Sequence, residues 1–108
     1  MFNLCFETGK VYQSSDGAYF LITTKLFKEN RKLGILNNRR DVGQNSKIYG
    51  LGFRWQTDHY FDDKLDAYAV PVTYVDSFDE FGRNSYCELI KEIDVIIPNH
   101  IKEIFEND

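Results

Sequence analysis

Residues 48–56 constrain the fold more than any other part of the chain, because their side chains alternate with a period of two. The large apolar residues of this run fall on one face of an extended strand, and the glycines fall on the other. The first set is Tyr49, Leu51, Phe53 and Trp55, and the second begins with Gly50 and Gly52. Glycines inside a strand leave room for a bulge, a bend or the close approach of another backbone. The sequence therefore predicts a strand whose glycine face suits a barrel corner or a binding surface.

Further runs predict more strands around it. Residues 18–24 are rich in strand-forming residues, and the turn signal Ser14-Ser15-Asp16-Gly17 separates them from residues 10–13, which predicts a β-hairpin. Residues 67–75 alternate in the same way and predict another strand. Because Pro71 has no N–H to donate, we expect this strand at a sheet edge or with a bulge.

The C-terminal part adds one ambiguous segment and one helix. Residues 85–97 fit the spacing of a strand and that of a helix, and their β-branched residues favour the strand. After Pro98, the spacing of Ile101, Ile104 and Phe105 predicts a short helix whose apolar side docks on the sheet. We therefore expect one α+β domain over residues 1–108, with a small curved antiparallel sheet or an SH3-like barrel of five or six strands and a short C-terminal helix.

Composition narrows the class of protein. Apolar residues make up 43% of the 108 residues and aromatic residues 16%, too much for a disordered chain to leave in water. There is no run of about 18 apolar residues and no leader-like N-terminus. Cys5 and Cys87 are far apart and predict free thiols in a reducing compartment. We expect a cytoplasmic protein without a membrane partner, and residue types that AT-rich codons favour are compatible with a phage or mobile element.

The charges are segregated along the chain. Residues 25–50 carry seven Lys and Arg against two acids, whereas residues 57–82 carry seven Asp and Glu against Lys64. The net charge of -4 therefore hides a dipole. Such a surface steers charged macromolecular partners, because the summed field raises the encounter rate.

The basic stretch is one candidate surface. Arg31, Lys32, Arg39 and Arg40 could neutralise RNA phosphates, while the aromatic residues of 48–56 stack bases. The alternative is a solvated loop beside core aromatics, and the acidic net charge favours this alternative. The apolar residues of 26–36 indicate that the first half of the stretch packs as a short strand or turn. The aromatic strand 48–56 could instead form a homodimer interface.

The acidic, aromatic stretch is the other candidate surface. Carboxylates beside exposed aromatic rings suit a basic pocket on another protein, where aromatic residues often carry the binding energy. The predicted binding residues are Asp58, Tyr60, Phe61, Asp62, Asp63, Phe78, Asp79, Glu80 and Phe81.

The same stretch holds the densest set of metal-ligand residue types. They are Asp58, His59, Asp62, Asp63 and Asp66. Their spacing matches no calcium loop, so we predict a hydrated turn and no metal.

Catalytic motifs are missing from the sequence. His59 and His100 have no recognisable nucleophile beside them, and no phosphate-binding glycine loop is present, so no cofactor is implied. The favoured interpretation is a small non-enzymatic binding protein that occupies a site on a larger protein, either as an inhibitor or as an interaction module.

Four segments support a different interpretation. Residues 9–12, 19–23, 69–73 and 85–94 follow one another in an order that resembles the MazF/PemK-type toxin barrels, endoribonucleases on an SH3-like fold. That family places a catalytic Thr or Ser at the end of a Pro-containing strand, a position that Thr73 matches. It also places a catalytic arginine before the second strand, where residues 13–17 contain no basic residue. The resemblance implies an endoribonuclease that uses Thr73, with Arg31, Arg39 or Arg40 of the basic stretch folding back to take the arginine's role.

Overall fold

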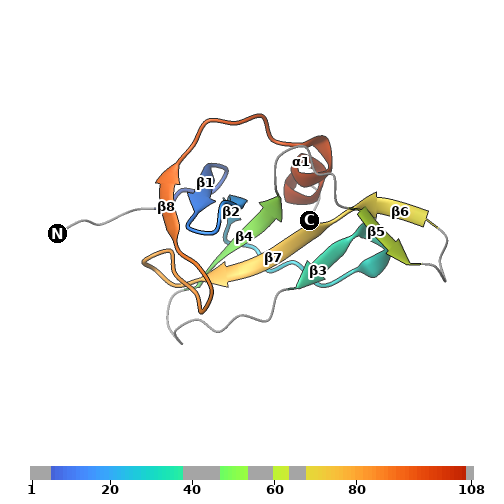
Figure 1. The fold of residues 1–108 in the computed structure, drawn as a ribbon, viewed down its shortest axis with the longest axis horizontal. Coiled ribbons are helices and arrows are strands. Elements are labelled where there is room, and N and C mark those ends of the chain that lie inside the picture. The colour runs from blue at the N-terminus through green and yellow to red at the C-terminus, as the bar shows by residue number, and fades with distance from the viewer. Residues whose placement is uncertain (1–5, 38–46, 54–59, 64–67, 107–108) are drawn as a thin grey trace.

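The computed structural model describes residues 6–37, 47–53, 60–63 and 68–106, which form an α+β fold (Figure 1). In chain order the elements are β1 (Val11–Ser14), β2 (Tyr19–Thr23), the 3-10 turn η1 (Arg31–Leu33), β3 (Ile35–Asn37), β4 (Ile48–Phe53), β5 (Tyr60–Asp63), β6 (Tyr68–Pro71), β7 (Thr73–Phe78), β8 (Leu89–Glu92) and the helix α1 (Asn99–Glu106).

Six of the described strands form one sheet in the order β3-β7-β4-β2-β1-β8. All neighbours are antiparallel except β3 and β7, which run parallel. The outer strands β3 and β8 do not pair with each other, so the sheet is open, while β5 and β6 form a separate two-stranded sheet. The predicted α+β fold with a small curved sheet and a C-terminal helix is confirmed. The sheet is mixed rather than wholly antiparallel, and it does not close into a barrel.

Both faces of the sheet are covered, and every residue of the central strand β2 is buried. On one face a core cluster joins the sheet to Ile101 of α1, with Ile104 and Phe105 packed against it. The cluster on the other face joins the sheet to the segment between β7 and β8. The first cluster contains Val11, Tyr19, Leu21, Phe27, Ile35, Leu51, Phe53, Val75 and Ile101, and the second contains Tyr12, Ala18, Phe20, Ile22, Phe78, Cys87 and Leu89.

The predicted hairpin is confirmed by the pairing of β1 with β2, in which Gln13 lies opposite Tyr19. The N–H of Ser14 donates to the carbonyl of Ala18 at 2.8 Å, and the hydroxyl of Ser14 bonds to the carboxylate of Asp16. Gly17 closes the turn with a φ of 90°, a conformation that costs a glycine little. The turn residues of the sequence therefore set the register of the hairpin.

The glycines of β4 make room for the ring of Phe20, which lies on the neighbouring strand. Phe20 pairs with Gly52, and Ile22 pairs with Gly50. A Cβ at Gly52 would lie 2.7 Å from Phe20 Cε1 and 3.2 Å from the carbonyl oxygen of Tyr74. The close approach predicted for this face is present, and an aromatic side chain makes the tightest of these contacts.

The strand predicted over residues 67–75 is interrupted at Val72. Its first part, β6, pairs with β5, and its second part, β7, becomes a central strand between β3 and β4. Pro71 ends β6 opposite Tyr60, as expected for a residue that cannot donate to a ladder. The edge position expected for the whole strand is wrong for β7, which has a neighbour on each side. The sequence predicted a hydrated turn before the Tyr68 strand. This prediction was wrong at Tyr60–Asp63, which form β5. Asp58, His59 and Asp66 lie outside the described residues.

The strand predicted within residues 85–97 is confirmed over part of that range, where it forms β8. The predicted C-terminal helix is confirmed, and α1 begins at Asn99 directly after Pro98. Within the first half of the basic stretch, Phe27 and Ile35 are buried and residues 31–37 contain η1 and β3, which confirms that it packs as a short strand or turn. Leu26 and Leu33, which were expected to contribute to this packing, are exposed. Within the described ranges, no helix has the length and apolar character that crossing a bilayer requires.

Candidate functional site

The predicted acidic binding residues that the structure describes lie toward opposite ends of β7. The β5–β6 hairpin precedes this strand, and Asp79, Glu80 and Phe81 follow it, so that the two groups occupy different ends of the molecule in Figure 1. At about 3.3 Å per residue, the six residues of β7 separate them by roughly 20 Å. They form two surfaces rather than one.

The structure places the individual predicted residues as follows. Four of the predicted residues form β5, namely Tyr60, Phe61, Asp62 and Asp63, and they lie opposite Pro71, Val70, Ala69 and Tyr68 in that order. Asp58 lies outside the described residues. Phe78 is fully buried and packs edge to face on Phe20, with ring centroids 5.1 Å apart. Because β7 is a central strand, Phe78 belongs to the core and not to a binding surface. Phe81, in contrast, is 57% exposed.

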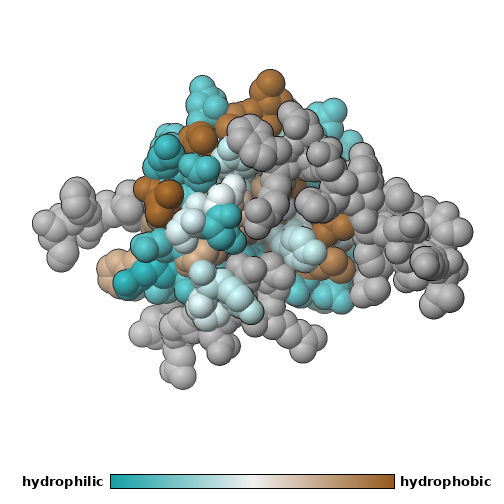
Figure 2. All heavy atoms as spheres, in the orientation of Figure 1, coloured by the Kyte–Doolittle hydropathy of each residue, from teal (hydrophilic) through white to brown (hydrophobic). Residues whose placement is uncertain are grey.

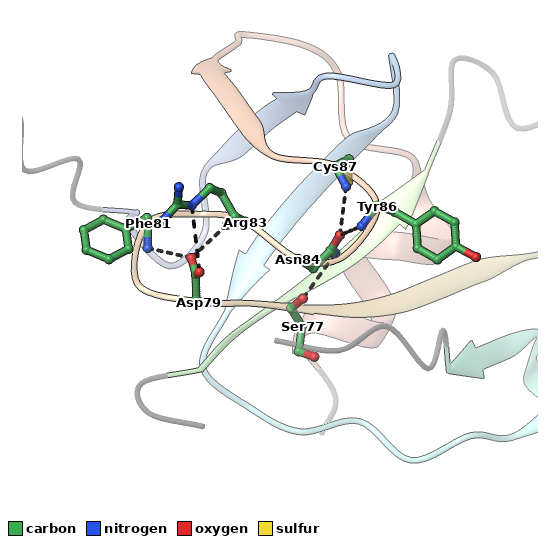
Figure 3. A network of polar contacts seen from close by, with 7 residues as sticks. All are labelled: Ser77, Asp79, Phe81, Arg83, Asn84, Tyr86 and Cys87. Atoms are coloured by element: carbon green, nitrogen blue, oxygen red, sulfur yellow. Dashed lines mark hydrogen bonds and ion pairs between the residues drawn. The ribbon is translucent and has the colours of Figure 1, made fainter. Parts of the chain in front are cut away.

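The chain between β7 and β8 folds into two consecutive turns, residues 79–88, which we call the double turn (Figure 3). In the first turn, Asp79 Oδ1 accepts the N–H groups of Phe81 at 2.8 Å and Arg83 at 3.0 Å. The N–H of Gly82 donates to the carbonyl of Asp79 at 2.9 Å, and Gly82 has a φ of 73°. An Asp side chain that accepts backbone N–H groups of its own turn stabilises that turn locally.

The second turn is organised by Asn84 in the same manner. Its Oδ1 accepts the N–H groups of Tyr86 at 2.8 Å and Cys87 at 3.0 Å, and its Nδ2 donates to the carbonyl of Ser77 at 3.3 Å. The N–H of Asn84 also donates to the carbonyl of Cys87 at 3.0 Å. One amide side chain therefore ties the second turn to β7 (Figure 3).

Contacts at its end anchor the double turn to the sheet. The N–H of Leu89 donates to the carbonyl of Gly82 at 2.7 Å, the N–H of Ser15 donates to the carbonyl of Glu88 at 2.8 Å, and the N–H of Glu88 donates to Ser15 Oγ at 3.1 Å. The side chain of Cys87 is buried in the core. The end of the double turn is thus fixed to the β1–β2 hairpin before any partner arrives.

This backbone displays two aromatic side chains on the surface. Phe81 is 57% exposed and Tyr86 is 72% exposed, and Figure 3 shows them pointing to opposite sides of the double turn. The guanidinium of Arg83 lies 5.0 Å from the ring centroid of Phe81, and its Nε lies 3.9 Å from Asp79 Oδ2. An exposed ion pair contributes little stability, but the cation over the ring restricts the motion of the Phe81 side chain.

The charges around the exposed rings are mostly negative. Asp79 and Arg83 balance each other. Glu80 and Glu88 are exposed, and neither has an ion pair within the described part of the chain. On the face shown in Figure 2, hydrophobic areas are scattered among hydrophilic ones rather than joined in one broad patch. The double turn therefore combines exposed rings with carboxylates that form no ion pair among the described residues.

Sequence reasoning found Asp79, Glu80 and Phe81 but missed Arg83, Asn84 and Tyr86. A signal was present, because Asp79 and Gly82 are followed by Asn84 and Ser85, all residues that favour tight turns. What the sequence did not show is that two such turns follow each other directly. This succession is what places a ring on either side of the double turn.

The residues of the ribonuclease and homodimer interpretations lie elsewhere. Thr73 is fully buried opposite Ile35, and its Oγ1 has no hydrogen-bond partner among the described residues. Phe53 is buried against Tyr19 at 5.7 Å between ring centroids, so it belongs to the core and is not displayed for stacking or dimerisation. Arg39, Arg40, Trp55 and Cys5 lie outside the described residues, Arg31 begins η1, and Lys32 is exposed.

His100 is the one histidine among the described residues, and it is half-buried at the start of α1. Its Nε2 is buried and has no hydrogen-bond partner in the described part of the chain. Burial lowers the pKa of His100, against a smaller opposing effect of the Glu103 carboxylate. Neutral His100 is therefore favoured, but no nucleophile is placed beside it among the described contacts.

Two further findings bear on function. In the ranges that the structure describes, no group of three or more His, Cys, Asp or Glu side chains is arranged to hold a metal ion. Comparisons with protein-family models, with curated protein sequences and with solved structures found no significant match. The function must therefore be argued from the surface itself.

Proposed function

We propose that this protein is a small non-enzymatic interaction module that occupies a site on a larger protein through its double turn. The observation that carries the proposal is the display of Phe81 and Tyr86, 57% and 72% exposed, on a backbone held by the side chains of Asp79 and Asn84. A surface that exposes two large rings while fixing the chain beneath them is typical of a binding element.

The physical advantage is that binding loses little conformational entropy, because the backbone beneath the rings is already ordered. Immobilising a flexible side chain on binding costs about 0.5–1.5 kcal/mol, and disordered loops lose backbone entropy as well. The double turn has already lost that backbone freedom, because its hydrogen bonds form within the free protein. More of the contact energy of Phe81 and Tyr86 then remains as affinity. Aromatic residues and arginine are enriched among residues whose truncation costs about 2 kcal/mol or more.

The charges indicate the kind of partner surface. Glu80 and Glu88 are exposed without ion pairs in the described residues, so a partner with Lys or Arg around an apolar pocket complements them. A partner with an acidic rim is disfavoured by like-charge repulsion. This extends the sequence-based hypothesis to a defined element, in which Asp79 holds the turn and Phe81 makes the contact.

The test is affinity purification of the tagged protein from a bacterial host lysate, with and without RNase, followed by mass spectrometry. We expect one stoichiometric protein partner that survives RNase. The variant Phe81→Ala with Tyr86→Ala should lose it. Ile96→Ala should retain it, because Ile96 is 94% exposed but lies outside the double turn. Circular dichroism confirms that both variants are folded.

Two outcomes contradict the proposal. Recovery of RNA or ribosomal material that RNase abolishes would indicate nucleic-acid binding. Retention of the partner by the folded double variant would exclude the double turn as the contact surface, and the variant Tyr60→Ala with Phe61→Ala would then test the β5 surface.

A further inference from the structure

The segment that leads from β2 to β3 exposes two leucines among lysines. Leu26 is 67% exposed and Leu33 is 60% exposed, whereas Phe27 between them is buried. Lys25, Lys28 and Lys32 are all exposed. We call residues 25–33 the basic strip.

The basic strip is held in place by hydrogen bonds. The N–H of Asn30 donates to the carbonyl of Ile35 at 2.8 Å, and the N–H of Ile35 donates back to Asn30 at 3.0 Å. The N–H of Asn37 donates to Glu29 Oε1 at 3.3 Å. Residues 29 and 30 therefore run beside the edge strand β3, and buried Phe27 anchors the segment to the core. The two leucines are therefore exposed although the segment that carries them is held against the sheet.

The charges of the basic strip are almost all positive. Lys28 and Lys32 form no ion pair within the described residues, and the one acid of the strip, Glu29, accepts a backbone N–H. An anionic partner complements this surface. The choice lies between a nucleic acid and an anionic lipid surface, because both present clustered phosphates or carboxylates.

The apolar residues decide between the two. Proteins that bind single-stranded nucleic acid stack bases on exposed aromatic rings, and the one aromatic ring of the basic strip, Phe27, is buried. Leucine does not stack on bases, but it inserts at the boundary between headgroups and acyl chains. We infer that the basic strip binds reversibly to anionic membrane surfaces, with Leu26 and Leu33 inserted and the lysines at the headgroups. The sequence-based expectation of no membrane partner considered spanning segments and leaders, which surface binding does not need.

The expected binding is weak and sensitive to salt. Each lysine near an anionic bilayer contributes about 1 kcal/mol, a factor of about five in the partition coefficient. Replacing Lys28 and Lys32 should therefore weaken binding about 30-fold. Because the contribution of each lysine depends on the surface potential, added salt should release the protein.

The experiment is co-sedimentation of the full chain with vesicles of phosphatidylcholine alone and of phosphatidylcholine mixed with phosphatidylserine, at low and high salt. We expect binding to the mixed vesicles at low salt and release at high salt. Lys28→Gln with Lys32→Gln and, separately, Leu26→Ser with Leu33→Ser should each reduce binding at least tenfold, given the contributions of lysine charge and apolar burial. Ile96→Ser, which removes a 94% exposed apolar side chain outside the basic strip, should bind as the wild type does.

The inference is overturned if the wild type does not sediment with mixed vesicles at low salt, or if Ile96→Ser loses as much binding as the leucine variant. Binding to polyuridylate that the lysine variant loses and the leucine variant keeps, without vesicle binding, would assign the basic strip to RNA instead. The variant Phe81→Ala with Tyr86→Ala should bind vesicles normally. Failure of the protein-partner proposal is therefore distinguishable from failure of this one.

Discussion

Adding one methyl group at Gly52 tests how the core is packed around Phe20. In Gly52→Ala the new Cβ would lie 2.7 Å from Phe20 Cε1, 3.2 Å from Phe20 Cδ1 and 3.2 Å from the carbonyl oxygen of Tyr74. Phe20 is 3% exposed and touches the buried ring of Phe78, so it has little space into which to move. The methyl group must displace either a core ring or the backbone of β7.

Two effects of opposite sign determine the magnitude. Overpacking a core costs about 1–3 kcal/mol. Alanine is more favourable than glycine within a strand by about 0.5–1 kcal/mol. The overpacking is the larger effect, so we expect Gly52→Ala to lower the free energy of unfolding by about 1–2 kcal/mol. The midpoint of thermal unfolding should fall by about 4–8 °C for each kcal/mol in a domain of this size.

Urea and thermal unfolding followed by circular dichroism measure this loss, and a double-mutant cycle assigns its cause. Phe20→Leu removes most of the ring that meets the new Cβ, so Gly52→Ala should cost about 1 kcal/mol less in that background. The reasoning is refuted if Gly52→Ala is as stable as the wild type. It is also refuted if the loss is the same in both backgrounds.

Three further outcomes follow from the described contacts. Ile101→Ala should lower the free energy of unfolding by about 2–5 kcal/mol in urea titrations, because Ile101 is fully buried under α1, whereas Ile96→Ala should change it by less than about 0.5 kcal/mol. Burial lowers the pKa of His100 in the folded state, so its contribution to stability is present above the unfolded value of 6.5 and is lost as the pH falls through the folded pKa. Urea titrations across this range should show a smaller pH dependence for His100→Gln than for the wild type, and an equal slope would contradict the assignment. Asn84→Ala removes the bonds that hold the second turn and should cost about 1–2 kcal/mol of stability and weaken partner capture with both rings intact, and unchanged capture would show that preorganisation is unimportant.

Several elements of the fold were predictable from the sequence. The hairpin of β1 and β2, the strand β4 and the helix α1 all follow local rules, because turn residues, side-chain alternation and a proline act within a few positions of the chain. The strand β5 was missed, because Asp62 and Asp63 favour a hydrated turn until a partner strand is supplied. Its pairing with β6 depends on a contact that the local sequence does not encode.

The candidate site was also predictable only where the local sequence decides the structure. The sequence by itself determined that rings and carboxylates gather in residues 57–82 and that Asp79 and Gly82 favour a turn. Only the tertiary structure decided which rings reach the surface. Phe78 and Phe81 stand three residues apart, yet β7 lies in the middle of a sheet covered on both faces and buries the first, while the turn held by Asp79 exposes the second. Burial depends on which strands pair across the whole chain, and that pairing is set by the competition of all apolar segments for the two buried faces of the sheet.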